Sequence, residues 1–296
     1  MAAWRDAMSA TLGSTWQVLR RLSARRGTSL SFAFLLLVAL AAVFADVLPL
    51  DPLTQNLADS LMPPSASAWF GTDELGRDIL ARVVYGARTS LVTAFGAVVI
   101  AALVGVPVGL VAGFFGDWRD SVLMRCIDVL LALPNILFAM ALIAVLGRSQ
   151  AAALVAVGIA GIPNFARIAR AQVMALRQLD FVTAVRSFGG GSSYIMFRTI
   201  LPNALSPLVV QAIVLASVAI LLEAALAFLG VGVPPPTPSW GEMLRTGKSY
   251  LHEAPTYAVL PGLVLTLTIL SFDTIGRALT ALLDRQDTGI PERRGR

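Results

Sequence analysis

Six stretches of this 296-residue chain run for 18 residues or more without a charged side chain. An α-helix rises about 1.5 Å per residue, so roughly 20 apolar residues cross the hydrocarbon core of a bilayer. Six such runs in one chain are not expected of a soluble domain. The sequence therefore predicts an all-α membrane protein with six transmembrane helices, at 28–45, 89–115, 129–147, 149–166, 199–222 and 254–272.

Positive charge is concentrated in three segments that six spans place on one side of the membrane. These segments are the tail 1–27, the loop 167–198 and the tail 286–296. Basic segments near span ends stay on the cytoplasmic side. We therefore expect a multi-pass protein of the cytoplasmic (inner) membrane with both termini in the cytoplasm. We interpret the formal charge of +5 as a topology signal and not as nucleic-acid binding, since basic residues do not alternate with aromatic ones.

The spans divide the chain between its two tails into three parts. Transmembrane helix 1 is predicted at 28–50, an outer segment at 51–88, and a five-helix core at 89–285 with a long inner loop at 167–202. Charges from Asp73 to Arg88 recur at helical intervals, which predicts a helix along the membrane surface. The end of the first span resembles a signal-peptide cleavage site, but its apolar run is longer than a signal peptide's. We expect a retained anchor.

Two features inside the spans predict how the helices pack. Gly105, Gly109 and Gly113 recur every four residues and so share one helix face, which is how membrane helices approach closely. Pro134 interrupts the third span, because proline cannot donate a helical hydrogen bond. The sequence therefore predicts a tight helix contact in the second span and a kink in the third.

The residues that carry catalysis or bind metals are nearly absent from this sequence. It has one histidine, His252, and one cysteine, Cys126, which we expect to be a buried apolar residue. Neither a histidine-based zinc site nor a conventional catalytic triad can be assembled, so the chain is predicted not to be an enzyme.

Ionisable groups near the spans are few. An ion-coupled carrier should have several near mid-membrane, since each is expensive there and is a functional candidate by default. Only Glu223 lies deep in a span, and we expect it to cap or hydrogen-bond a loop. The others lie at span edges: Asp46, Asp128 and Asp273.

The inner loop is long, basic and patterned like two short helices around Gly189-Gly190-Gly191. The first is predicted to begin at a cap on Asp180 and end before the glycines, which readily adopt left-handed conformations. The second is predicted to begin at an N-cap on Ser192, and Pro202 to begin the next span. Two short helices projecting from the membrane would form a docking site for a cytoplasmic partner.

The segment 181–203, FVTAVRSFGGGSSYIMFRTILPN, resembles the EAA loop of ABC-importer permeases. That loop reads Glu-Ala-Ala, three residues, Gly, nine residues, then Ile-x-Leu-Pro. Four residues match at the family's spacing: Ala184, Gly189, Leu201 and Pro202. Three depart from it, at the glutamate, the second alanine and the isoleucine: Thr183, Val185 and Thr199.

The resemblance extends to about two thirds of the sequence, in the family's order. FGTDELGRDILARVVYGARTSL at 70–91 and EAALAFLGVGVPPPTPSWGEML at 223–244 are similar to segments of the dipeptide/oligopeptide (DppC/OppC-like) permeases. So are the segments at 131–147, 162–182 and 261–285, although Asp273 and Arg277 stand where relatives often have Asn and Asp.

The resemblance implies a type I ABC importer with the MetI-like permease fold. In such importers this chain and a sister B-type permease form the pore in the lipid bilayer. Two cytoplasmic ATPase subunits bind ATP and magnesium, an extracytoplasmic solute-binding protein delivers the solute, and this chain holds no cofactor. The resemblance places the ATPase-coupling loop at Asp180, Thr183, Ala184, Val185, Gly189, Leu201 and Pro202.

The solute implied by the resemblance is a di- or oligopeptide. Relatives of this subfamily also carry glutathione, nickel complexes and other small solutes, so these stay as alternatives within the same class of transporter. A distant alternative is an ion-coupled secondary carrier. The sequence assigns no residue to substrate.

Overall fold

The computed structural model describes residues 26–288, so the predicted tails at 1–27 and 286–296 lie almost wholly outside the described part. Over the described range the chain is helical, and its only β-pairing is an isolated bridge between Thr72 and Asp78. The α-helices are α2 (Arg26–Val43), α3 (Ile79–Phe115), α4 (Asp117–Leu130), α5 (Asn135–Leu146), α6 (Gln150–Leu176), α7 (Asp180–Ser187), α8 (Ser192–Tyr194), α9 (Leu201–Phe228), α10 (Trp240–Gly247) and α11 (Thr256–Thr288). Two 3-10 turns and one π-helical segment complete the list: η1 (Leu57–Asp59), η3 (Lys248–Tyr250) and η2 (Ile195–Ile200).

Four helices of the described range are long and apolar enough to cross a bilayer: Ile79–Phe115, Gln150–Leu176, Ser192–Phe228 and Thr256–Leu283. The pair α4 and α5 passes the same test only together, as a fifth span bent by 82°. The apolar part of α2, Gly27–Val43, falls just short of this length. The all-α fold is confirmed. The sixth span stays a prediction that rests on α2.

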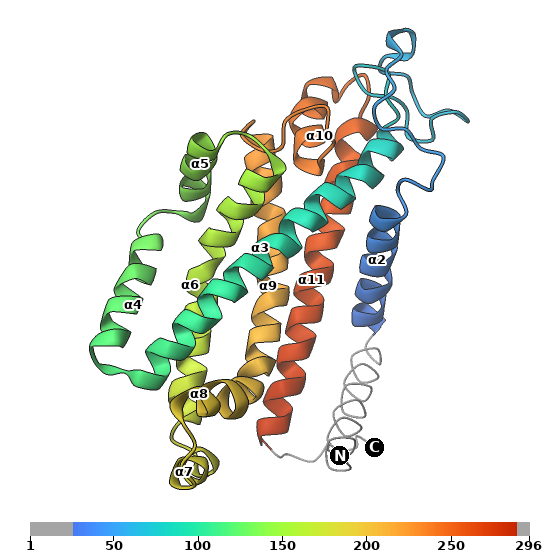
Figure 1. The fold of residues 1–296 in the computed structure, drawn as a ribbon. Helices are drawn as coiled ribbons and strands as arrows, with labels where there is room; N and C mark the ends of the chain where they lie inside the picture. The colour runs from blue at the N-terminus through green and yellow to red at the C-terminus, as the bar shows by residue number, and fades with distance from the viewer. Residues whose placement is uncertain (1–25, 289–296) are drawn as a thin grey trace, which may run out of the picture.

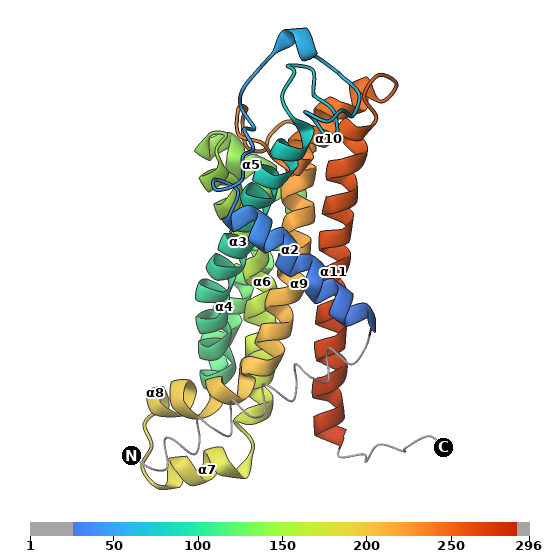
Figure 2. The same ribbon diagram turned by 90° about the vertical axis from the view of Figure 1, so that its right-hand side faces the viewer.

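The two ends of the bundle carry different structures. Figure 1 shows the 51–78 segment and α10 at one end, and α7 and α8 at the opposite end, with α3, α6, α9 and α11 running between them. Figure 2 shows α2 crossing the outside of α11. The loops predicted to be outer and inner are therefore separated by the length of the bundle.

Helix α3 begins earlier than the sequence analysis expected. The Asp78 side chain caps it by accepting a hydrogen bond from the Leu80 backbone N–H, and the helix then continues without a break to Phe115. The predicted surface helix at 73–88 is therefore wrong. Of the charges that suggested it, Arg82 is 1% exposed and bonded inside the protein, whereas Arg88 forms a partly exposed pair with Asp46.

The predicted glycine stripe is confirmed as the contact between α3 and α6. A Cβ atom on Gly105 would lie 2.7 Å from the carbonyl oxygen of Ile162, one on Gly109 2.3 Å from that of Ala166, and one on Gly113 2.7 Å from that of Arg170. Residue numbers at the contact increase in the same direction on both helices, so α3 and α6 run parallel. No other residue type allows backbones to approach this closely.

The break in the third span falls where Pro134 predicts it. Pro134 is the N-cap of α5, and residues 131–134 separate the two helices. Only Ile127 of α4 is buried, and Cys126 is exposed. The expectation that Cys126 is buried was therefore wrong, because α4 turns most of its surface away from the bundle.

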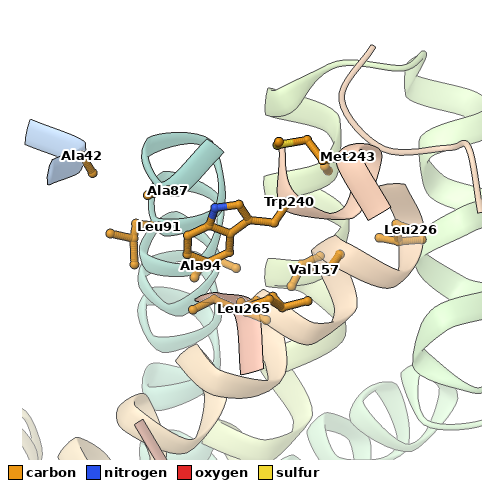
Figure 3. Packing of buried hydrophobic residues seen from close by; sticks show 14 of the residues in the cluster. Ala42, Ala87, Leu91, Ala94, Val157, Leu226, Trp240, Met243 and Leu265 are labelled. Atoms are coloured by element: carbon orange, nitrogen blue, oxygen red, sulfur yellow. The ribbon is translucent and has the colours of Figure 1, made fainter. Parts of the chain in front are cut away.

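At the end of the bundle that carries α10, Trp240 fixes this helix onto α3. The indole is fully buried, and its Nε1–H donates to the carbonyl oxygen of Val83 over 3.0 Å. Figure 3 shows Trp240 beside Ala94 of α3 and Leu265 of α11, all within one buried apolar cluster. Gly86 leaves room for the ring, since a Cβ there would lie 3.0 Å from the indole Cδ1.

A buried ion network joins the outer segment to the same two helices. The Arg82 guanidinium on α3 lies 3.0 Å from a Glu242 carboxylate oxygen on α10 and 3.3 Å from one of Asp73. Asp73 in turn pairs with Arg77 at 2.6 Å and accepts the Leu75 backbone N–H. Buried charges are tolerated when they are paired in this way.

The acidic residues near the spans are all bonded. Three form ion pairs: Asp46 with Arg88 (2.9 Å), Asp128 with Arg167 (2.8 Å) and Asp273 with Arg277 (2.7 Å). Glu223 is 1% exposed and accepts a hydrogen bond from the Ser90 hydroxyl on α3 over 3.0 Å. These contacts give each group at least one structural partner, but the second carboxylate oxygen of Glu223 is buried without one among the described residues.

Replacing Gly109 with alanine should destabilise the protein by about 1–3 kcal/mol, since the new Cβ would press on the α6 backbone. Gly276→Ala is the matched control, because its Cβ would meet nothing closer than 3.5 Å and alanine favours a helix. Thermal unfolding of the two purified variants in detergent measures the difference. An unchanged midpoint for Gly109→Ala would show that the α3–α6 contact is not close.

Candidate functional site

The candidate site is the inner loop, built from α7, the glycine run and α8. Helix α7 begins after Leu179, whose backbone is extended (φ −78°, ψ 150°) and whose carbonyl accepts the Val182 N–H. Asp180 is therefore the first helical residue and not the cap, so that prediction was wrong by one position. Its carboxylate still lies in the first turn, where a negative charge favours the helix.

Gly189 ends α7 as the glycine run predicts. Its φ is +83°, in the left-handed region, and its N–H donates to the Arg186 carbonyl while that of Gly190 donates to Val185. This is the Schellman arrangement, which satisfies the last carbonyls of a helix. A Cβ on Gly189 would meet no atom within 4 Å, so the backbone angle alone selects glycine.

The second loop helix merges with the span that follows it. Gly191 is the N-cap of α8, so Ser192 is its first residue and the predicted serine cap was wrong. The chain continues through η2 into α9, which has Pro202 in its first turn as predicted. In η2 the hydrogen bonds skip one extra residue, as from the Leu201 N–H to Met196. Such π-helical segments are rare and often lie at functional sites.

Apolar contacts fix the loop to the bundle. Val182 of α7 and Ile195 of η2 are both buried, together with Leu110 of α3 and Val173 of α6. Because Leu110 and Val173 come from the two helices α3 and α6, the loop is seated on the contact between them. Helix α7 is therefore attached to α3 and α6 through side-chain packing.

Arginines of α6 complete this attachment. The predicted loop begins at 167, but α6 continues to Leu176, so its first arginines stand on a helix. Arg170 binds both carboxylate oxygens of Asp120 on α4 at 2.6 Å. Arg177 donates to the carbonyls of Gly113 and Phe114, which end α3. The positive charges that indicated topology also cap and join helices.

The exposed face of the loop is aromatic. Phe188 is 93% exposed and Tyr194 56% exposed, and with Val185 and the three glycines they line one surface groove. Thr183 and Ala184 are exposed on α7, while Leu201 is half-buried and Pro202 exposed. The structure thus brings the α7 residues and Gly189 to one surface, whereas Leu201 and Pro202 stand at the base of α9.

Sequence reasoning missed Phe188 and Tyr194. The available signal was their position on either side of the glycine run, in a segment too polar to span a membrane. The described residues contain no group of three or more His, Cys, Asp or Glu side chains that could hold a metal. What the loop offers is an exposed apolar surface.

Two family descriptions match the sequence. Residues 105–286 match "Binding-protein-dependent transport system inner membrane component", and residues 14–64 match "N-terminal TM domain of oligopeptide transport permease C". Together they cover most of the chain, including the inner loop.

Curated relatives align over most of both chains. The dipeptide transport system permease protein DppC of Alkalihalophilus pseudofirmus is 43% identical over 83% of this chain and 81% of its own. The di/tripeptide transport system permease protein DppC of Pseudomonas aeruginosa is 43% identical over 85% of each. The glutathione transport system permease protein GsiD of Pectobacterium atrosepticum is 39% identical over 84% of this chain and 83% of its own.

A solved structure supports the fold. A chain of the inward-facing MetNI methionine ABC transporter superposes with a TM-score of 0.51 at 20% identity, covering 68% of this chain and 97% of its own. The MetI-like permease fold is therefore confirmed. From the family match over 105–286 and the 43% identity to curated permeases, this multi-pass chain belongs to the binding-protein-dependent transport system inner membrane components.

Proposed function

We propose that this chain is a permease subunit of an ATP-driven ABC importer that moves di- or oligopeptides into the cell. The observation that carries this proposal is the inner loop, an exposed aromatic surface that Val182 and Ile195 hold rigidly against the spans. A surface of this kind suits a cytoplasmic partner that supplies the energy. The chain is then not itself an ATPase, and ATP and magnesium bind on that partner.

The names of the relatives support peptides as the solute. The two relatives at 43% identity are named for dipeptides and for di- and tripeptides. Glutathione is the second candidate, since permeases named for it reach 39% and 40% identity. Glutathione is itself a small peptide, so one pathway could suit both.

The complete transporter would contain this chain, a sister B-type permease, two ATPase subunits and an extracytoplasmic solute-binding protein. The inner loop faces the cytoplasm in this arrangement, and both termini lie on the same side. The outer segment and α10, at the opposite end of the bundle, face the solute-binding protein.

Coupling would use α7 as a lever. Closure of the ATPase pair on ATP would push α7, and the apolar cluster under Val182 would carry the movement to α3 and α6. The π-helical segment η2 joins the lever to α9, where a helix can change direction at small cost. Two arrangements of these helices would give inward- and outward-facing states.

An ion-coupled carrier is the less favoured mechanism. Carriers of that kind need ionisable groups inside the membrane that bind and release an ion. The acidic residues at the edges of the described spans are paired with arginines. Glu223 alone lies deep in the described bundle, where Ser90 donates to one of its oxygens and the other is buried without a partner. A single such group is fewer than an ion-coupled carrier needs.

Uptake of a labelled dipeptide should stop when the ATPase partner is made catalytically inactive while the membrane ion gradients are intact. The measurement is uptake in cells whose transporter carries the inactive ATPase, with membrane potential recorded in parallel. Uptake that persists would contradict an ATP-driven mechanism and favour the ion-coupled carrier. Solute binding to the cognate outer binding protein identifies the peptide class.

Gly189→Val should uncouple transport and leave the fold intact. A β-branched residue at φ +83° strains the backbone by about 1–3 kcal/mol, which changes the direction of the chain after α7. Gly191→Val is the matched control, because Gly191 has φ −69° and a Cβ there would meet no atom within 4 Å. Peptide uptake and peptide-stimulated ATP hydrolysis are measured for both. Peptide uptake by Gly189→Val at the wild-type rate would contradict the lever mechanism.

Phe188→Asp should weaken binding of the ATPase subunit without changing the stability of this chain. The side chain is 93% exposed here, so an aspartate is solvated unless a partner covers it. Phe188→Leu, which keeps the apolar character, should retain binding. Copurification of the ATPase measures the effect, and thermal unfolding of the chain is the control. Equal recovery of ATPase with both variants would remove Phe188 from the interface.

A further inference from the structure

A cavity of about 590 Å³ lies between α6, α9 and α11, near the inner end of the bundle. Five uncharged polar residues line it: Gln172, Asn203, Ser206, Gln211 and Thr280. None of its lining residues is charged, and its remaining walls are apolar. Its size is in the range of pockets that hold small ligands.

Two polar side chains of this cavity, Asn203 and Thr280, bond to the carbonyl one turn earlier, as hydroxyl groups elsewhere in the spans do. Its two glutamines differ from this pattern. Hydroxyl groups such as those of Thr93, Thr266 and Thr274 donate to the carbonyl one turn earlier in their own helix. Gln172 and Gln211 are half-buried, and their carboxamides make no hydrogen bond to another described residue. A glutamine is expensive at this depth without a partner, so these two are available for a ligand or its water.

Proline adds a backbone acceptor to the same cavity. Pro207 lines it and has no N–H, so it cannot donate to the carbonyl of Asn203, its partner one turn earlier. Helix α9 continues through Pro207, and membrane helices tolerate proline where neighbouring groups or water satisfy the freed carbonyl. The cavity therefore combines carboxamide donors and acceptors with a wall residue, Pro207, that leaves one carbonyl of α9 without its helical donor.

The cavity also adjoins the inner loop. Its wall includes Leu176, the last residue of α6, and Asn203, whose Nδ2–H donates to the carbonyl of Thr199 in η2 over 2.6 Å. Gln211 lies ten residues into α9, about 15 Å from its start. A movement of η2 therefore changes the shape of the cavity at its inner side.

We propose that this cavity is the inner solute-binding site of the transport pathway, and that its carboxamides bind the peptide groups of the solute. This inference rests on the proposed function and names the residues that contact the solute. A peptide group presents one N–H and one C=O, which a carboxamide can match with its own acceptor and donor. Recognition of the backbone alone accepts peptides of many sequences, and the absence of charge lets the solute leave again.

Charge placed in the cavity should change which peptides pass. Gln211→Glu should raise the ratio of lysine-containing to glutamate-containing dipeptide uptake by about three- to fivefold, and Gln211→Lys should lower it by a similar factor. The same two substitutions at Gln55, which is exposed in the outer segment, are charge-matched controls. They should leave the ratio of lysine- to glutamate-containing dipeptide uptake unchanged. The assay uses cells whose own copy of the chain is replaced by each variant. A ratio that stays constant in expressed Gln211 variants would overturn the inference.

Labelling tests what occupies the cavity. In a Cys126→Ala background, Gln211→Cys should react with a charged thiol reagent in membranes, and excess dipeptide should slow the reaction. Val209→Cys, on another exposed face of α9, should not be protected by dipeptide. A Gln211→Cys thiol that never reacts would show that lipid or a neighbouring helix fills the cavity, and the inference would fail.

The two proposals fail separately. If wild-type cells take up no peptide, the peptide function is wrong, and the cavity loses its assigned ligand with it. If wild-type uptake is normal and depends on ATP, but neither the ratio nor the labelling responds, only the cavity inference is wrong.

Discussion

The structure depends on how closely α3 and α6 approach each other. Apolar side chains gain little by leaving lipid for protein, so helices in a bilayer associate through close packing. Gly105, Gly109 and Gly113 allow the two backbones to meet where any Cβ would collide. Helix α3 carries the Arg82 network and the Trp240 contact at one end, and both helices seat the inner loop at the other. One pair of helices therefore positions both ends of the protein.

Much of this fold is predictable from the sequence, because a bilayer restricts backbone structure so strongly. Uncharged runs locate α3, α6, α9 and α11, the glycine spacing locates a close contact, and Gly189 locates the end of α7. The sequence could not show that α3 continues past its charges, since Arg82 is satisfied by Glu242, 160 residues away in the chain. Nor could it show which side chains of the loop face outward. The exposure of Phe188, the C-cap of α7, is decided by the burial of Val182 on that helix, which is a tertiary contact.

The candidate functional surfaces have opposite chemistry, as their proposed roles require. The inner loop presents aromatic side chains where a protein partner would bind. The cavity beside it presents uncharged amides, where a solute would pass. Arginines are used between these regions to join helices, as Arg170 and Arg177 do, so they create no charged barrier along the cavity wall. The partner surface and the solute cavity are thus separate, and neither needs a charged group. A chain with few ionisable groups in its spans can therefore still belong to an active transporter.

The π-helical turn at Ile195–Ile200 has a geometric consequence for α9. It contains one residue more than an α-helical turn, and one residue corresponds to a rotation of roughly 100° about the helix axis. If the extra residue moved along the chain, the part of α9 between its old and new positions would rotate about the helix axis, and the helix would stay continuous. Asn203 and Gln211 would then face a different neighbour in each arrangement, and a push on the loop would become a rotation of the cavity wall that they form.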